Sequence, residues 1–174
     1  MKHFLIVVDM QKDFIDGALG SAEAVAVLPA AKEVIRTFDG EIIATLDTHA
    51  ENYLETAEGR KLPVKHCIEG TEGHALHTEI AAALDGRKYE LVRKPTFGSK
   101  ELPRLIEKMA AGEDFTVTLI GLCTDICVVT NALLLKTAFP EADIAVVEKA
   151  CAGVTKASHD AAIMTMKSCQ IEIK

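Results

Sequence analysis

Short runs of apolar residues alternate along the chain with longer segments whose apolar positions repeat at the helical period. The short runs are rich in β-branched residues, which is typical of β-strands. The six predicted strands are His3–Asp9, Glu41–Asp47, Tyr89–Lys94, Thr116–Gly121, Asp143–Glu148 and Gln170–Ile173. The five predicted helices are about Glu23–Phe38, Gly73–Leu84, Lys100–Ala111, Asp125–Ala138 and Thr155–Lys167. This alternation indicates repeated βα units.

The first four predicted strands are almost wholly apolar, as expected for strands that are covered on both faces. Such strands, separated by helices, are typical of a parallel sheet between two helical layers. We therefore predict an α/β doubly wound domain with three layers, α/β/α, around a six-stranded parallel sheet. No linker, repeat or low-complexity tract interrupts the pattern, so residues 1–174 are predicted to form a single domain.

Length, composition and charge argue against nucleic-acid and membrane partners. The chain has 174 residues, of which 49% are apolar and 26% charged, which is ordinary for a globular protein. Acidic residues outnumber basic ones, the net charge is −7, and the basic residues are scattered, so we expect no nucleic-acid partner. The apolar stretches fall short of the roughly 20 residues that span a bilayer, so no membrane partner is expected either.

The amino terminus and the cysteines point to a reducing compartment. Met1-Lys2-His3 leads into an apolar run that is too short for a signal peptide, so we expect a cytoplasmic location. The five cysteines are an odd number in a chain long enough not to need disulfides, which favours free thiols.

Polar residues follow four of the predicted strands. They are Asp9 after the first, Asp47 and His49 after the second, Lys94 at the end of the third, and the segment Cys123–Cys127 after the fourth. In doubly wound sheets, ligands bind outside the carboxyl ends of the strands, where the strand order reverses. Two carboxylates, an amine, an imidazole and thiols are therefore predicted to converge, which is a set of catalytic groups.

Cys127 is the best candidate for a nucleophile. It is predicted to lie in the first turn of a helix that Thr124 or Asp125 would cap, where unpaired backbone N–H groups stabilise a thiolate. The alternative is a small core residue, the commonest role of a free cysteine. Cys123, four residues earlier, fits neither a C-x2-C redox motif nor a zinc knuckle, so we interpret its side chain as packing.

A cysteine nucleophile also needs a base and a positive charge that holds the thiolate. Asp9 and Lys94 are the charged residues at neighbouring strand ends, and both are candidates for these roles. Each taken alone could equally be a helix cap or a turn former.

The long segment from Thr48 to about Glu72 suggests a metal site. Extended backbone at Asp47-Thr48-His49 would point the carboxylate and the imidazole to one side. His66 lies in the same loop, and Glu58 or Glu55 could add an oxygen ligand for zinc, iron or manganese. The alternative is a solvated loop with incidental histidines.

Five motifs occur in the order found in the isochorismatase-like cysteine hydrolases, and the chain most resembles the nicotinamidase branch of that family. The motifs are Val8-Asp9-Met10-Gln11-Lys12-Asp13-Phe14, Asp47-x-His49, His66-Cys67-x-x-Gly70-Thr71-x-Gly73, Lys94-Pro95-Thr96-Phe97, and Gly121-Leu122-Cys123-Thr124-Asp125-Ile126-Cys127-Val128 with Thr130-x-Ala132. Together they cover nearly the whole chain, which makes the resemblance far more specific than any single motif.

The resemblance implies a Rossmann-like parallel sheet and a catalytic triad of Asp9, Lys94 and Cys127. It also implies a cis peptide bond between Leu122 and Cys123 that aims a backbone N–H into the site. With the backbone N–H of Cys127, that of Cys123 would form an oxyanion hole.

The activity implied by the resemblance is hydrolysis of a small amide, nicotinamide or similar, to an acid and ammonia through a thioester on Cys127. Phe14 matches the aromatic wall against which a flat ring packs in the family. We further expect a divalent metal beside the triad, a small-molecule amide as the partner, and assembly into a homo-oligomer.

Other functions stay open. Hydrolysis of an isochorismate-like vinyl ether does not need a cysteine nucleophile, so Cys127 weighs against it. A ureide or carbamoyl-amine amidohydrolase of the same superfamily, a non-catalytic relative that binds a small molecule, and a redox protein that uses Cys123 and Cys127 are the further alternatives.

The chain also departs from the family's nicotinamidases. Thr48 and Ala50 flank His49, where the family commonly has tryptophan and proline, and the chain has no tryptophan at all. Lys12 replaces the usual asparagine, and a second loop histidine is missing, which leaves Glu58 or Glu55 as the remaining metal ligand. These changes spare the triad and alter the pocket.

Overall fold

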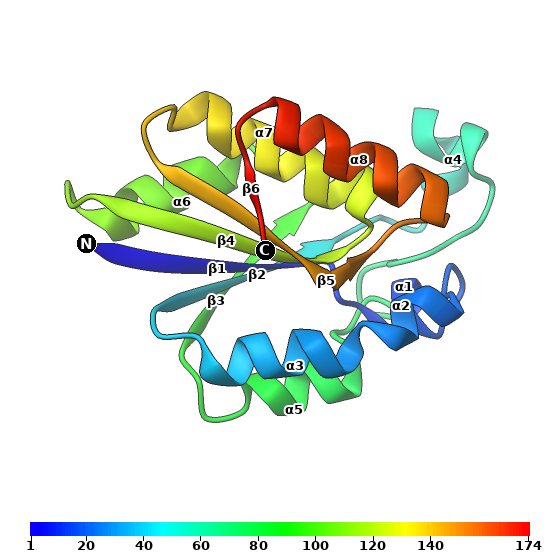
Figure 1. Ribbon diagram of the computed structural model, residues 1–174. Helices are drawn as coiled ribbons and strands as arrows, with labels where there is room; N and C mark the ends of the chain where they lie inside the picture. Colours follow the sequence, from blue (N-terminus) through cyan, green and yellow to red (C-terminus); the bar gives the residue numbers. More distant parts are fainter.

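A computed structural model describes all residues, 1–174, and contains one parallel six-stranded sheet in the order β3-β2-β1-β4-β5-β6 (Figure 1). The strands are β1 (Lys2–Val8), β2 (Glu41–Asp47), β3 (Tyr89–Lys94), β4 (Phe115–Leu122), β5 (Asp143–Ala152) and β6 (Glu172–Ile173). All five strand pairings are parallel, which confirms the predicted fold class.

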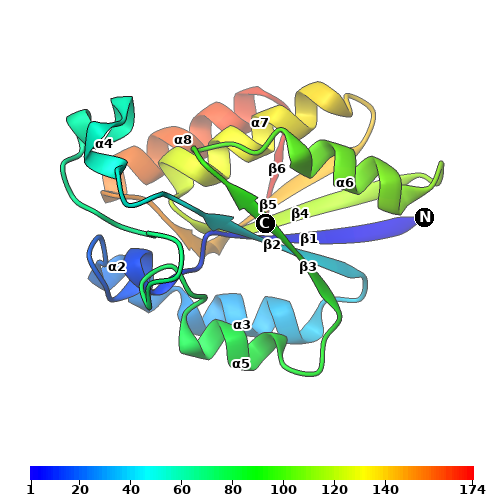
Figure 2. The same cartoon turned by 180° about the vertical axis from the view of Figure 1, so that it is seen from behind.

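Helices cover both faces of the sheet. They are α1 (Lys12–Ile15), α2 (Ala22–Ala26), α3 (Leu28–Thr37), the 3-10 turn η1 (Tyr53–Glu55), α4 (Ala57–Lys61), α5 (Thr78–Leu84), α6 (Glu101–Ala110), the π-helical turn η2 (Thr124–Val128), α7 (Val129–Ala138) and α8 (Lys156–Ser168). Figures 1 and 2 show α3 and α5 on one face and α6, α7 and α8 on the other. No helix has the length and apolar character needed to cross a membrane.

The central strand β1 illustrates why both faces are covered. Its side chains alternate, so Phe4, Ile6 and Val8 pack in the core beneath α6, α7 and α8. Leu5 and Val7 pack in the opposite core with α3 and α5. All five side chains are buried, which explains why the strand reads as a continuous apolar run.

The strand order reverses between β1 and β4, which both end at the same edge of the sheet. Val8 of β1 pairs there with Gly121 of β4. Gly121 has a φ of +122°, and a Cβ at this position would lie 2.1 Å from the carbonyl oxygen of Val8. Only glycine therefore permits this close approach, which brings the segment after β4 beside the residue that follows β1.

Several predicted elements need correction. The helix predicted over Glu23–Phe38 is split into α2 and α3 at Val27, where Pro29 cannot donate to the helical ladder. The helix predicted from Gly73 begins only at Thr78, because the backbone carbonyls of Gly73 and Ala75 accept hydrogen bonds from residues 12 and 13 instead.

Two strands also differ from the prediction. β3 is an edge strand, and its Leu91 is half-exposed, so the expectation that it is covered on both faces is wrong. β5 continues beyond the predicted end at Glu148, because after an irregularity in register its last residues pair again with Gly121 and Leu122. This extension carries residues 150–152 to the edge where β1 and β4 end.

Candidate active site

The structure brings Asp9, Lys94 and Cys127 together at the carboxyl edge of the sheet. The Nζ atom of Lys94 lies 2.5 Å from the Oδ2 atom of Asp9 and 3.4 Å from the Sγ atom of Cys127. All three side chains are buried, and that of Lys94 is among the largest fully buried ones in the protein. Because burying an unpaired charge is costly, this arrangement requires the ammonium and a carboxylate to stay in contact.

The end of β1 positions Asp9. Its φ of +45° lies in the left-handed region, which turns the chain sharply out of the strand. The hydroxyl of Thr45 on β2 donates a hydrogen bond of 2.6 Å to Oδ1 of Asp9 and leaves Oδ2 for Lys94. A residue of the neighbouring strand thus orients this carboxylate.

Cys127 lies in the η2 turn, but neither predicted residue caps it. The residue at the N-cap is Cys123, and no side chain forms a capping hydrogen bond. Thr124 bonds instead to Nδ1 of His159 at 2.8 Å, and the Asp125 carboxylate accepts from the backbone N–H of Val154 at 3.0 Å. Both side chains therefore tie the nucleophile turn to the start of α8.

Burial and neighbouring charges shift the pKa values of all three side chains. Burial and the Asp9 carboxylate raise the pKa of Cys127, and the positive charge of Lys94 opposes them. Burial also raises the pKa of Asp9 against the opposing effect of Lys94. Burial lowers the pKa of Lys94, but Asp9 and Cys127 outweigh it and raise that pKa. The pKa of the Cys127 thiol is thus raised despite the ammonium beside it, whereas the turn's backbone N–H groups alone suggested a lowered pKa.

The peptide bond between Leu122 and Cys123 is cis, as the resemblance implies. The backbone N–H of Cys123 donates no hydrogen bond to another protein group, although its carbonyl accepts two from the η2 turn. This N–H is therefore free to bind an acceptor brought in from outside.

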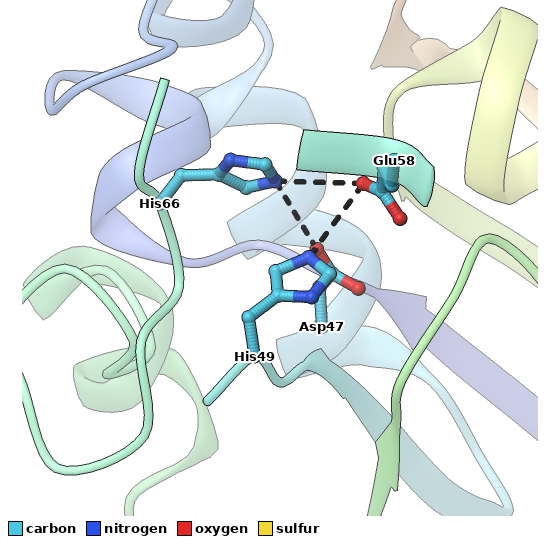
Figure 3. Close-up of side chains that lie close together, drawn as sticks. All are labelled: Asp47, His49, Glu58 and His66. Carbon is cyan, nitrogen blue, oxygen red and sulfur yellow. Dashed lines mark ion pairs between the residues drawn. The ribbon is translucent and has the colours of Figure 1, made fainter. Parts of the chain in front are cut away.

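A second cluster lies beside the triad. It contains Asp47, His49, Glu58 and His66, and one potential ligand atom from each lies within 4.8 Å of all the others (Figure 3). The Oδ2 atom of Asp47 is 2.9 Å from Nε2 of His49 and 3.5 Å from Nε2 of His66. Of the two glutamates predicted as alternatives, Glu58 is in the cluster and Glu55 is not.

The cluster fits a divalent cation. Nε2 of His49 is buried and makes no well-aligned hydrogen bond, although it lies 2.9 Å from Oδ2 of Asp47. Nδ1 of His66 donates to the carbonyl oxygen of Val64 at 2.8 Å, so its Nε2 lone pair faces the cluster. Burial raises the pKa of Asp47, but the two histidines and Lys94 outweigh it and lower that pKa, so the carboxylate is ionised. Two imidazoles and two carboxylates suit zinc, iron or manganese.

Asp47 also joins the two clusters, which the sequence did not indicate. While Oδ2 contacts the histidines, Oδ1 lies 3.4 Å from Nζ of Lys94.

Tyr53 packs against both histidines of the cluster. It is fully buried, and its ring centre lies 4.7 Å from that of His49 and 4.9 Å from that of His66.

Gln11 holds Asp47 in place and was not among the predicted site residues. Its Nε2 donates to the carbonyl of Asp47 at 2.9 Å and to that of His74 at 2.8 Å, and its Oε1 accepts from the N–H of Asp47 at 2.8 Å. The β1–β2 backbone pairing ends at Val8 and Thr45. The primary amide of Gln11 thus replaces the missing strand partner. The only sequence signal was its place in the first motif.

We expect Gln11→Glu to lower both stability and metal affinity. A carboxylate still accepts from Asp47 but cannot donate to the two buried carbonyls, and each lost bond costs about 1–3 kcal/mol. The Tm should fall by several degrees, at about 2–4 °C per kcal/mol. Affinity for zinc should fall about 10–100-fold in chelator competition. Gln170→Glu, at an exposed site, is the matched control; equal effects in both variants would contradict this role.

A cavity of about 380 Å³ opens over both clusters. Cys127, Asp47, Glu58 and His66 reach its surface, and the rest of the lining is mostly apolar. The lining residues are Phe14, Leu19, Gly20, Ser21, Ala24, Asp47, Glu58, Leu62, His66, Phe97, Leu122, Cys123, Ile126, Cys127, Ala152, Gly153 and Val154. Phe14, the predicted aromatic wall, is among the lining residues. The wall from the end of β5 was missed because that strand was predicted to stop at Glu148.

Comparisons with known proteins agree with this fold. A relative described as an uncharacterized isochorismatase family protein PncA, from Bacillus subtilis (strain 168), is 31% identical over 147 residues, or 76% of this chain and 78% of the relative. The zinc complex of a pyrazinamidase from Pyrococcus horikoshii has a TM-score of 0.84 at 26% identity, over 100% of this chain and 99% of that chain. An N-carbamoylsarcosine amidase from Thermoplasma acidophilum has a TM-score of 0.78 at 27% identity, over 100% and 96%. Because the isochorismatase domain matches residues 3–173, nearly the entire length, this chain belongs to the isochorismatase family.

Proposed function

We propose that this protein is a cysteine amidohydrolase that cleaves nicotinamide or a similar small neutral amide to the acid and ammonia. One observation carries the proposal. Cys127 lines a mostly apolar cavity, and its Sγ atom lies 3.4 Å from an ammonium group that is paired with a buried carboxylate. A thiol, a proton acceptor and a positive charge in contact are the parts that acyl transfer through a thioester needs.

In the first half of the proposed reaction, Asp9 accepts the thiol proton of Cys127 as Sγ attacks the carbonyl carbon of the amide. Lys94 stabilises the thiolate as it forms, since its positive charge lowers the pKa of the thiol. The backbone N–H groups of Cys123 and Cys127 hold the oxyanion of the tetrahedral intermediate. Asp9, whose pKa is raised by burial, returns the proton to the leaving nitrogen, and ammonia departs.

In the second half, water attacks the thioester, and Asp9 accepts its proton. The C–S bond breaks, the acid leaves, and Cys127 regains its proton from Asp9. The sum is one amide and one water converted to one carboxylic acid and one ammonia, with no oxidant or reductant required.

Asp47, His49, Glu58 and His66 would hold a divalent metal in this enzyme. When bound, the metal would supply a Lewis acid that attracts a ring nitrogen of the substrate and acidifies bound water. One of the solved relatives is a complex with zinc, a metal that this donor set suits. Asp47 would then link the metal site to Lys94, because its Oδ2 atom faces the histidines and its Oδ1 atom faces the Lys94 ammonium.

The cavity lining favours a neutral substrate over an acidic one. No lysine or arginine is among the lining residues, and the two charged ones, Asp47 and Glu58, are acidic. Isochorismate and N-carbamoylsarcosine both carry carboxylates, which such a pocket would have to bind without a lysine or an arginine. Nicotinamide is uncharged and flat, and it fits the wall formed by Phe14.

Ammonia release separates these candidates. Purified protein supplied with zinc, iron or manganese would be assayed with nicotinamide, pyrazinamide, N-carbamoylsarcosine and a ureide, and with isochorismate by its loss of absorbance. We expect turnover of the two heteroaromatic amides and little or none of the acids. Turnover of N-carbamoylsarcosine or isochorismate alone would contradict the proposal, and so would no turnover of any substrate.

We expect Lys94→Met to slow alkylation of Cys127. Without the ammonium, the thiolate loses the nearby positive charge while the Asp9 carboxylate stays beside it, so the pKa of the thiol rises further. The measurement is the rate at which iodoacetamide at neutral pH modifies the peptide containing Cys127, followed by mass spectrometry. Lys108→Met, at an exposed site on α6, is the control. Equal rates in all three proteins would show that Lys94 does not stabilise the thiolate.

A further inference from the structure

The cavity is larger than nicotinamide requires. Its volume of about 380 Å³ lies in the range of roughly 300–1,000 Å³ that is typical of pockets for drug-sized ligands. Nicotinamide has only nine non-hydrogen atoms. A substrate of that size would leave part of the cavity unfilled after its amide reached Cys127 and its ring reached Phe14.

Three apolar side chains line the cavity and yet are exposed to solvent, so they form its rim. They are Val154 (58% exposed), Phe97 (44%) and Leu62 (40%). They come from separate segments: the link from β5 to α8, the link from β3 to α6, and the residue that follows α4. Contact between apolar side chains and water is unfavourable, so covering these three side chains with an apolar group would lower the free energy.

The rim is continuous with the reaction centre, because the same cavity reaches from Val154, Phe97 and Leu62 to Cys127. No lysine or arginine lines it, so no ammonium or guanidinium group would pair with an anionic tail at the rim. The acidic residues Asp47 and Glu58 lie in the metal cluster at the inner end, beside Lys94. Charge and apolar area therefore divide the cavity into a polar inner end and an apolar mouth.

We propose that the preferred substrates are neutral aromatic amides that carry an apolar substituent, and that this substituent occupies the rim formed by Val154, Phe97 and Leu62. This inference rests on the proposed function and specifies its substrate class. The amide carbon reaches Cys127, the ring lies along Phe14, and the substituent extends outward to the rim.

The test compares kcat/KM for nicotinamide with kcat/KM for its 5-alkyl and 6-alkyl derivatives, from methyl to butyl. In at least one series, kcat/KM should rise by up to about fourfold for each methylene that the rim buries. If nicotinamide is cleaved but kcat/KM falls with chain length in both series, the inference is wrong and the proposed function stands. If none of the amides is cleaved, the proposed function is itself wrong, and this inference falls with it.

Two variants locate the effect. Val154→Asn should reduce the ratio of kcat/KM for the best butyl derivative to that for nicotinamide by about three- to tenfold, because it replaces apolar area at the rim with an amide. Met164→Asn on α8, which replaces an exposed apolar residue outside the cavity, should leave the ratio unchanged.

A second copy of the chain could cover the rim instead of a substrate. Sedimentation velocity distinguishes these two cases, because it measures the oligomeric state. If Val154→Asn changes the oligomeric state and leaves the selectivity ratio unchanged, the rim is a subunit contact and the proposal is wrong. An unchanged oligomeric state with a reduced ratio supports the substrate.

Discussion

Replacing Cys127 with alanine should lower kcat/KM for nicotinamide by a factor of about 10⁴ or more, because no other thiol contacts Lys94 and could replace it in forming the thioester. The fold should persist. The substitution removes one sulfur atom that lines the cavity, and the resulting loss of about 1 kcal/mol lowers the Tm by roughly 2–4 °C. Ammonia release and thermal unfolding, measured on the same preparation, test both statements.

Cys123→Ala is the matched control for this prediction. Both thiols line the same cavity, but Cys123 would contribute only its backbone N–H, which alanine keeps. We expect this variant to retain most of its activity. If Cys123→Ala were inactive and Cys127→Ala active, the assignment of the nucleophile would be reversed.

His49→Ala and His66→Ala should each reduce zinc affinity by about 100-fold or more, since loss of a direct ligand exceeds the 10–100-fold effect usual for outer-shell partners. Activity should fall in parallel, because the metal would lie beside Lys94 through Asp47. Metal content of protein prepared without chelator, together with activity before and after EDTA treatment and zinc addition, measures both quantities.

His77→Ala is the matched control, because His77 is also a buried histidine but lies outside the cluster, near Asp16. It should bind zinc as the unchanged protein does. Full activity after complete removal of metal, or unchanged metal content in His49→Ala and His66→Ala, would show that these histidines only support the loop.

Strand periodicity and the polar residues at strand ends were enough to predict the layered parallel sheet and the convergence of Asp9, Lys94 and Cys127. The reason is geometric: parallel strands end at one edge, so a residue that follows a buried apolar run has a predictable place. Element ends were less predictable. The break at Val27 and the late start of α5 depend on which backbone groups bond elsewhere in the fold.

The metal cluster was predicted in part. The spacing of Asp47 and His49 on extended backbone places both side chains on one side, and the structure has their polar atoms 2.9 Å apart. The choice of Glu58 over Glu55 required the tertiary structure, because the short helix α4 directs Glu58 toward the histidines. Local pattern does not determine which way a loop glutamate faces.

The sequence by itself determined the fold class, the family resemblance and the chemical groups available, since these depend on residue type and on order along the chain. Only the tertiary structure decided how those groups act on one another. Burial raises the pKa of Cys127, and Asp47 joins the two clusters. Gln11 completes the end of β2, and the extended β5 supplies a cavity wall. Desolvation and hydrogen-bond partners depend on segments far apart in the chain, so local patterns do not reveal them.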